Sequence, residues 1–273
     1  MSDLSMTAMY TSATWAWGKL PNADLLLTPE AERVFRIVNG ALSLAHPFGG
    51  APSLPHSLLA RHGILDDLVR ASGCKKILEL AAGLSRRGIT FSEDRSIRYV
   101  EVDTPDVIAE KRRILGRAAL GRELLTRENF ELIAGDVTQT DLDSFFPTAR
   151  EPLFVIAEGL LMYLPADTQM RLFAAVAARL RKYGGVFAFD LVPTCEQPSP
   201  GVAGRILGSA MRFFTRGGDF VRDARTRDDI RGELVVNGFS EVELHDARAS
   251  APSSPPIQQL VFSSVCNPET RSP

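Results

Sequence analysis

The stretch from Lys76 to Gly88, with the sequence KILELAAGLSRRG, constrains the fold of this chain more than any other. Its apolar start is typical of a buried parallel strand, and the small residues that follow predict a tight turn that a ligand approaches closely. The glycine spacing matches neither the dinucleotide fingerprint G-x-G-x-x-G nor the phosphate-binding pattern G-x-x-x-x-G-K-[ST]. The stretch therefore predicts either a nucleoside site without a pyrophosphate or a plain strand and turn of an α/β protein.

An acidic residue at the end of the next predicted strand favours the nucleoside site. The strand is predicted from Ser96 to Asp103, and Asp103 lies 20 residues after Gly83. At that distance, one strand-helix-strand unit, a carboxylate lies beside the first turn and can accept hydrogen bonds from both ribose hydroxyls. Glu101, on the same strand face, is the alternative. We prefer Asp103 because ligands bind at the carboxyl ends of such strands.

Strand and helix patterns alternate along the middle of the chain, which indicates a mostly parallel sheet in an α/β fold. Three further strands of this kind are predicted at 130–136, 152–159 and 185–192. Helices are predicted from Thr28, at 55–69, 105–117 and 172–183, and from Thr226 to 237. Two last strands at 240–246 and 260–266, joined by a turn rich in proline and serine, predict an antiparallel edge to this sheet.

The chain is expected to have two parts. Residues 1–72 are expected to form an N-terminal helical arm and cap, and residues 73–273 the ligand-binding α/β domain. The aromatic segment at 1–27 is either a loosely attached arm or a segment that docks over the ligand pocket. Residues 193–225 interrupt the alternation with prolines and glycines, so we expect an inserted lid there.

Composition narrows the class of partner. The chain has 273 residues, of which 45% are hydrophobic, and a formal net charge of −2. It can bury a sizeable core, and neither nucleic acid nor a membrane is expected as a partner. No apolar run reaches membrane-spanning length, and the N-terminal sequence does not resemble a signal peptide. Three widely spaced cysteines predict neither a disulfide framework nor a metal site, and a cytoplasmic location is expected.

Four residues are expected to meet at one edge of the sheet, namely Gly83, Asp103, Asp136 and Glu158. Each follows or ends a predicted parallel strand, and in an open sheet such strand ends converge on one crevice. The acid after the third strand can accept from an adenine amino group, and the acid after the fourth can hold an ammonium. A glycine and three carboxylates without a phosphate site match the cation S-adenosylmethionine. For Asp136 or Glu158 alone, the alternative interpretation is that the carboxylate caps a loop.

Three short motifs carry a resemblance to a known family. They are Val-Asp-Thr-Pro at 102–105, Gly-Asp-Val at 135–137 and Ala-Glu-Gly-Leu-Leu-Met-Tyr-Leu at 157–164. These motifs resemble the leucine carboxyl methyltransferase family, whose bacterial members include carboxyl methyltransferases of polyketide pathways. The resemblance extends from Ala60 to Phe239. It implies a Rossmann-like class I methyltransferase fold, with a mostly parallel seven-stranded sheet and an antiparallel edge strand, and S-adenosyl-L-methionine as the cofactor.

The resemblance also implies roles for single residues. In the family, the residue that matches Arg61 holds the cofactor carboxylate. The residues that match Gly83, Asp103, Asp136 and Glu158 contact the methionine part, the ribose, the adenine and the amino group respectively. A long helical side chain that solvates its own charge is the alternative for Arg61.

Three more positions of the chain bear on the cofactor site. Glu79 in the first strand and Val137 in the second motif are expected to belong to it. Many bacterial members of the family have Asp-Thr-Arg after the glycine and leucine of the first turn, where this chain has Ser-Arg-Arg at 85–87. The ligand contacts of that turn are therefore expected to differ.

The expected reaction makes few demands on side chains. Methyl transfer from a sulfonium requires alignment of the acceptor and exclusion of water. A carboxylate acceptor is already ionised, whereas a hydroxyl needs a base. The four histidines, His46, His56, His62 and His245, lie in no catalytic motif and are read as structural or surface residues.

One tyrosine remains a candidate at the acceptor. Tyr163 follows the fourth turn, where it either faces the acceptor or belongs to the core. The sequence thus predicts an O-methyltransferase for a small-molecule acceptor, a carboxylate before a hydroxyl or phenol. A methyltransferase-like protein that binds the cofactor without catalysis is the alternative from another class.

Overall fold

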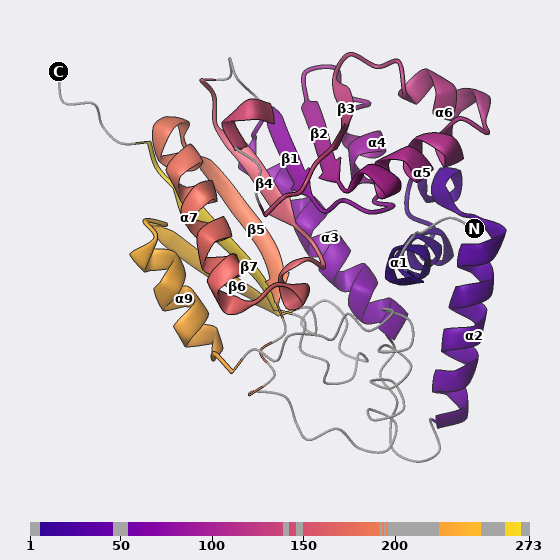
Figure 1. Ribbon diagram of the computed structural model, residues 1–273, viewed down its shortest axis with the longest axis horizontal. Coiled ribbons are helices and arrows are strands. Elements are labelled where there is room, and N and C mark those ends of the chain that lie inside the picture. Colours follow the sequence, from indigo (N-terminus) through magenta and orange to yellow (C-terminus); the bar gives the residue numbers. More distant parts are fainter. Residues whose placement is uncertain are drawn as a thin grey trace.

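A seven-stranded sheet forms the centre of the protein (Figure 1), in the order β3-β2-β1-β4-β5-β7-β6. The computed structural model describes residues 6–45, 54–138, 142–145, 150–191, 193, 195, 224–246 and 260–268. The strands are β1 Lys76–Leu80, β2 Arg98–Asp103, β3 Phe130–Ala134, β4 Leu153–Ala157, β5 Gly185–Leu191, β6 Glu241–Asp246 and β7 Leu260–Cys266. All seven predicted strands are therefore present.

The α-helices are α1 Met6–Trp17, α2 Pro29–Ala45, α3 Leu54–Ser72, α4 Arg87–Phe91, α5 Pro105–Leu115, α6 Ala119–Leu124, α7 Ala166–Tyr183 and α9 Arg227–Val236. Short 3-10 helices lie between these elements at Ala23–Leu26, Leu142–Phe145 and Leu161–Tyr163. Among the described residues, no helix is both long enough and apolar enough to cross a membrane. The predicted lid at 193–225 lies almost entirely outside the described residues.

The direction of the strands fits the prediction. Strands β1 to β5 pair in parallel, and β7 runs antiparallel to both β5 and β6. The predicted parallel sheet with an antiparallel edge is confirmed, with β7 lying one strand inside β6. The strand order reverses between the neighbouring strands β1 and β4, and ligands bind at such a point in open α/β sheets.

Helices cover both faces of the sheet because its central strands are apolar on both sides. All five residues of β4 are fully buried, as expected of a parallel strand between two helical layers. On one face, α7 and α9 pack against the strands through residues such as Phe173 and Leu234. On the other face, α3, α4 and α5 pack through residues such as Leu65, Ile89 and Ile114.

Two helix starts show why the sequence begins helices where it does. The side chain of Thr28 accepts a hydrogen bond from Ala31 N at 3.1 Å, which caps α2. Thr226 and Asp229 exchange side-chain and backbone hydrogen bonds in a capping box at the start of α9. The threonine-based predictions of both helices are confirmed.

The N-terminal aromatic segment forms a helix that packs on the rest of the chain. In α1, Tyr10 and Trp15 are 6% and 3% exposed, and they join a small apolar cluster with α2 and α3. The Tyr10 hydroxyl donates to Asn39 Oδ1 of α2 at 3.0 Å. Residues 6–17 are therefore packed on α2 and α3 and do not form a loosely attached arm; docking over a ligand pocket stays a prediction.

Candidate functional site

The first turn and the end of β2 form one side of the candidate site. Asp103 Oδ2 accepts from Gly83 N at 2.7 Å, and Asp103 Oδ1 accepts from Thr104 N at 2.7 Å. Each carboxylate oxygen therefore keeps a lone pair for a further donor. Gly83 has φ of 54°, and among the described residues a Cβ on it would meet, within 4 Å, only Ala8 Cβ at 3.8 Å. The turn thus presents bare backbone beside an acceptor.

Glu101, the alternative to Asp103, is committed elsewhere. Its carboxylate is fully buried and ion-paired with Lys111 Nζ, which also donates to the carbonyl oxygen of Ser85 at 2.6 Å. Burial raises the pKa of Glu101 to about 7 against the opposing effect of Lys111. Because Glu101 faces α5 beneath the turn, the geometry favours Asp103 as the acceptor for a ligand.

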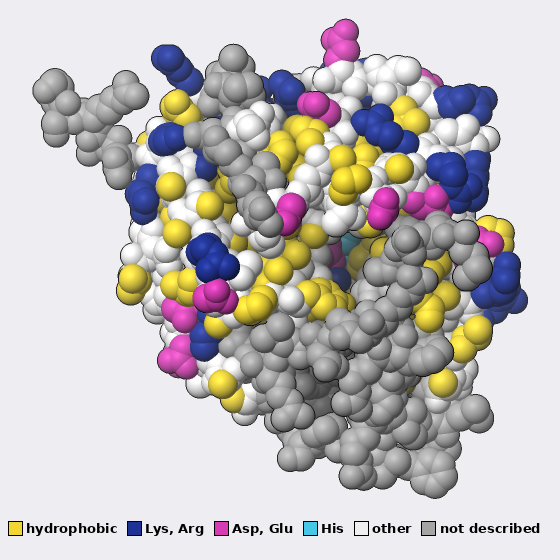
Figure 2. All heavy atoms as spheres, in the orientation of Figure 1, with side chains coloured by type: hydrophobic (Ala, Val, Ile, Leu, Met, Phe, Trp, Pro, Cys, Tyr) yellow, Lys and Arg dark blue, Asp and Glu magenta, His cyan; other side chains and the backbone are white. Residues whose placement is uncertain are grey.

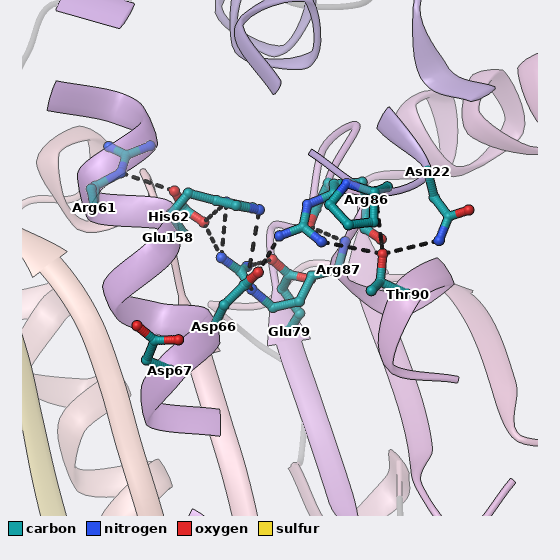
Figure 3. A network of polar contacts seen from close by, with 12 residues as sticks. Asn22, Arg61, His62, Asp66, Asp67, Glu79, Arg86, Arg87, Thr90 and Glu158 are labelled. Atoms are coloured by element: carbon teal, nitrogen blue, oxygen red, sulfur yellow. Dashed lines mark hydrogen bonds and ion pairs between the residues drawn. The ribbon is translucent and has the colours of Figure 1, made fainter. Parts of the chain in front are cut away.

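The end of β4 forms the other side. Arg61 of α3 donates from Nε to Glu158 Oε1 at 2.9 Å (Figure 3). It also donates from Nη1 to Asp190 Oδ2 at 2.8 Å. Asp190 Oδ1 accepts from Gly159 N at 2.5 Å. Arg61 Nη2 donates no hydrogen bond to the described residues, and it is not one of their fully enclosed polar atoms that lack a partner, so it is partly accessible. This nitrogen is therefore open to a ligand acceptor.

A buried cluster of charges holds Glu158 from below (Figure 3). Glu158 Oε2 lies 2.7 Å from Arg87 Nη2 and 2.9 Å from His62 Nδ1. Arg87 also donates from Nε to Asp66 Oδ1 at 2.8 Å and from Nη1 to Glu79. Burial alone would raise the pKa of Glu158, but His62, Arg61 and Arg87 hold it well below its ordinary value. Glu158 is thus a fixed anion.

Two residues that were predicted to belong to the cofactor site, Glu79 and Val137, contact other parts of the protein. Glu79 is 1% exposed, and its carboxylate binds Arg87 and the hydroxyl of Tyr99, the latter at 2.7 Å. It therefore supports the site from beneath the first turn. Val137, after β3, is half-buried and packs against the sheet core.

Asp136 lies on the open side of the sheet edge. It is exposed, and its Oδ1 accepts from Thr138 N at 2.9 Å and Thr138 Oγ1 at 2.7 Å. The preceding residue, Gly135, donates from its nitrogen to Asp103 O at 2.8 Å, which ties the turn after β3 to the end of β2. Asp136 and Asp103 thus come from neighbouring strand ends, as predicted.

Helix α1 lies against this edge of the sheet. The ring of Trp15 stacks on His62 with centroids 4.1 Å apart, and Ala8 is the neighbour of Gly83. Tyr163, after the fourth turn, has its pKa raised by burial, and it interacts with Thr7 of α1. Figure 2 shows the surface hollowed over α3, with acidic, basic and histidine atoms at the bottom of the hollow.

Sequence reasoning missed three members of this site, namely Asp190, Arg87 and His62. An acid near the end of β5 follows the same rule that identified Glu158, so Asp190 carried a usable signal. Arg87 and His62 carried none, because their partners lie far away in the sequence. Within the described residues, no group of three or more His, Cys, Asp or Glu could hold a metal ion.

Comparison with known proteins gives consistent matches. The sequence model of the family described as leucine carboxyl methyltransferase matches residues 21–177. A protein of Mycobacterium tuberculosis is 30% identical over 209 residues, which are 70% of this chain and 68% of the relative. It carries in its name the term S-adenosyl-L-methionine-dependent methyltransferase.

Two solved structures share the fold. An O-methyltransferase family protein from Burkholderia thailandensis has a TM-score of 0.52 and 11% identity, covering 97% of this chain and 73% of that one. The glycopeptide N-methyltransferase MtfA has a TM-score of 0.50 and 18% identity, covering 78% of this chain and 90% of that one. The predicted α/β fold with its seven-stranded sheet is thereby confirmed.

Proposed function

Because this chain belongs to the leucine carboxyl methyltransferase family, we propose that it methylates an oxygen of a small-molecule acceptor, a carboxylate in preference to a hydroxyl. The protein is an S-adenosyl-L-methionine-dependent methyltransferase, and the choice of acceptor atom is the proposal. The observation that best supports a bound cofactor is the set of strand ends described above. Asp103 accepts beside the bare backbone of Gly83, and Arg61 Nη2 is open on the other side.

The residues present fit the cofactor. The two oxygens of Asp103 each keep an acceptor position, which suits the two ribose hydroxyls, and Gly83 leaves room for the ligand. Asp136 lies at the adjacent strand end, where the adenine amino group would be held. Arg61 Nη2 would bind the carboxylate and Glu158 the ammonium. When bound, the cofactor supplies an electrophilic methyl group.

The surroundings support an acceptor that needs no base. Among the described histidines, His62 is enclosed against Glu158 and Arg87, His56 contacts Trp17 edge-on, and His245 bonds Ser263. Burial raises the pKa of Tyr163, so its hydroxyl keeps its proton at neutral pH and can donate a hydrogen bond. A carboxylate acceptor is already ionised and needs no base, so its methylation does not require any of these histidines or Tyr163 to remove a proton.

A pH profile of methyl transfer distinguishes the acceptors. With a carboxylic acid, we expect a rate that is flat from about pH 6 to 9, because the pKa of the acceptor lies near 4. The product should be cleaved by mild base, as an ester is. A base-stable product whose rate climbs through neutral pH would instead identify a hydroxyl acceptor. Binding of S-adenosylhomocysteine without turnover of any acceptor would support the non-catalytic alternative.

Binding of the cofactor product should also change the environment of α1. Trp15 stacks on His62, which contacts Glu158, and Ala8 of α1 is next to Gly83. In a Trp17→Phe background, S-adenosylhomocysteine should shift the emission of Trp15 and slow proteolysis within residues 1–27. A matched Trp15→Phe variant should lose the emission change. An unchanged emission together with an unchanged cleavage rate would show that α1 does not cover the site.

A further inference from the structure

Asp190 of β5 is an enclosed carboxylate that contacts both Arg61 and Gly159 in the candidate site. Its side chain is 0% exposed. Burial of an ionised carboxylate costs several kcal/mol unless hydrogen bonds and an opposite charge compensate. Asp190 has both, because Oδ2 accepts from Arg61 Nη1 at 2.8 Å and Oδ1 accepts from Gly159 N at 2.5 Å. One carboxylate thus joins α3 to the turn that follows β4.

These contacts fix the orientation of Arg61. A guanidinium is planar and its donors form a rigid fork, so fixing two of its nitrogens fixes the third. Arg61 Nε is held by Glu158 and Nη1 by Asp190. The remaining nitrogen, Nη2, then lies beside Gly159, where a Cβ would be 3.8 Å from it. Gly159 has φ of 68°, in the left-handed region that favours glycine, and it carries no side chain that could cover Nη2.

We propose that Asp190 is a positioning residue for the α-carboxylate of the cofactor, because it aims Arg61 Nη2 at that group. The same carboxylate fixes Gly159, next to Glu158, so it also sets the distance between the sites for the carboxylate and the ammonium. This inference rests on the proposed function, since it requires an amino-acid end on the ligand. Asp190 itself acts through Arg61 and Gly159.

The contacts distinguish this role from simple core packing. An apolar side chain of similar volume usually stabilises a core as well as a buried ion pair does or better. The charge of Asp190 is therefore explained by the orientation that it gives to Arg61 and Gly159, and not by a gain in core stability. Asparagine has the same shape as aspartate, but an NH2 group replaces one of the two carboxylate oxygens, and this group cannot accept from Arg61 or from Gly159 N. Asp190→Asn thus releases one of the two restraints without leaving a cavity.

The test compares two probes by calorimetry. S-Adenosylhomocysteine carries the amino-acid end, and 5′-methylthioadenosine lacks it. For Asp190→Asn, we expect the affinity for S-adenosylhomocysteine to fall about 10-fold or more, as for hydrogen bonds to charged groups, while methylthioadenosine changes by less than about 2-fold. Arg61→Lys, which keeps the charge but loses the fork, should show the same pattern. Asp167→Asn, on the exposed face of α7, is the matched control.

A second substitution tests whether Asp190 acts through Arg61. In the Arg61→Lys background, Asp190→Asn should lower the affinity for S-adenosylhomocysteine by less than about 2-fold, because the group it positions is already gone. Equal losses for both probes, or full additivity with Arg61→Lys, would overturn the inference. If Asp190→Asn does not fold, Asp190→Ser is used in its place, since its hydroxyl can accept from Gly159 N. A wild-type protein that binds neither probe would overturn the proposed function itself.

Discussion

Replacement of Arg87 by methionine should lower the free energy of unfolding by about 3–5 kcal/mol, the range for removing one partner of a buried ion pair. The Arg87 side chain is 0% exposed and lies among three carboxylates, those of Asp66, Glu79 and Glu158. Methionine fills much of the volume but leaves these carboxylates without their shared cation. Urea unfolding at pH 7, followed by circular dichroism, measures the loss.

The loss in the free energy of unfolding should also depend on pH. Burial would raise the pKa of Asp66 and of Glu158, but Arg87 and its neighbours hold both pKa values below their ordinary range. Groups with depressed pKa values stabilise the fold above their unfolded pKa of about 4, and this contribution is lost as the pH falls through the folded value. The difference between wild type and variant should therefore be largest at neutral pH and shrink below about pH 4.

Arg113→Met is the matched control for this experiment. Arg113 pairs with Glu110 on α5 at 2.5 Å, but its side chain is 54% exposed. Surface ion pairs contribute about 0–1 kcal/mol, so this variant should unfold nearly as wild type does. If Arg87→Met were no more destabilising than Arg113→Met at pH 7, the buried cluster would not hold the site together.

Replacement of Asp103 by alanine should weaken the binding of S-adenosylhomocysteine by about 1.5–3 kcal/mol, or about 10- to 150-fold. The reason is that the two oxygens of Asp103, each fixed by one backbone N–H at 2.7 Å, would accept from the ribose hydroxyls. Calorimetric titration measures the change in Kd. Asp103→Asn should show a smaller loss, because one amide oxygen remains.

Two comparisons make the result for Asp103 specific. Glu131→Gln removes a charge from β3, where Glu131 is half exposed and pairs with Arg98, and it should leave the affinity unchanged. Adenine alone, which lacks the ribose, should bind wild type and Asp103→Ala equally. An unaltered Kd for S-adenosylhomocysteine in Asp103→Ala would show that the ribose binds elsewhere.

The sheet could be predicted because each of its strands has a local signature. The parallel strands are short apolar runs with small or acidic residues at or next to their carboxyl ends, and both antiparallel strands border turn sequences. Helix α7 was predicted six residues too short, since Ala166 to Arg171 contains few apolar residues for a stripe. Helix α6 was missed, because its six residues include a glycine, Gly121, and are too few to show a period.

The candidate site could be predicted only in part, for a topological reason. Parallel strands bring their carboxyl ends to one edge, so Asp103, Asp136 and Glu158 could be grouped from spacing alone. Spacing does not tell which acids become enclosed by internal partners. Glu79 and Glu101 are register partners on the adjacent strands β1 and β2, yet Glu79 forms an ion pair with Arg87 and Glu101 forms one with Lys111. Each pair joins a strand to the helix that follows it, and neither periodicity nor residue spacing marks the pairing in the sequence.

The position of β7 has a consequence for biosynthesis. It is the last strand that the structure describes, yet it lies between β5 and β6, and its Phe262 stacks on Phe189 of β5 at 5.2 Å. While the chain emerges from the ribosome, β5 therefore has an open hydrogen-bonding edge until residues 260–266 follow. Closure of the sheet is thus a late, long-range step that begins after translation has passed β7. Until then, the nascent chain offers a template for pairing with other chains, which is the hazard that chaperones counter.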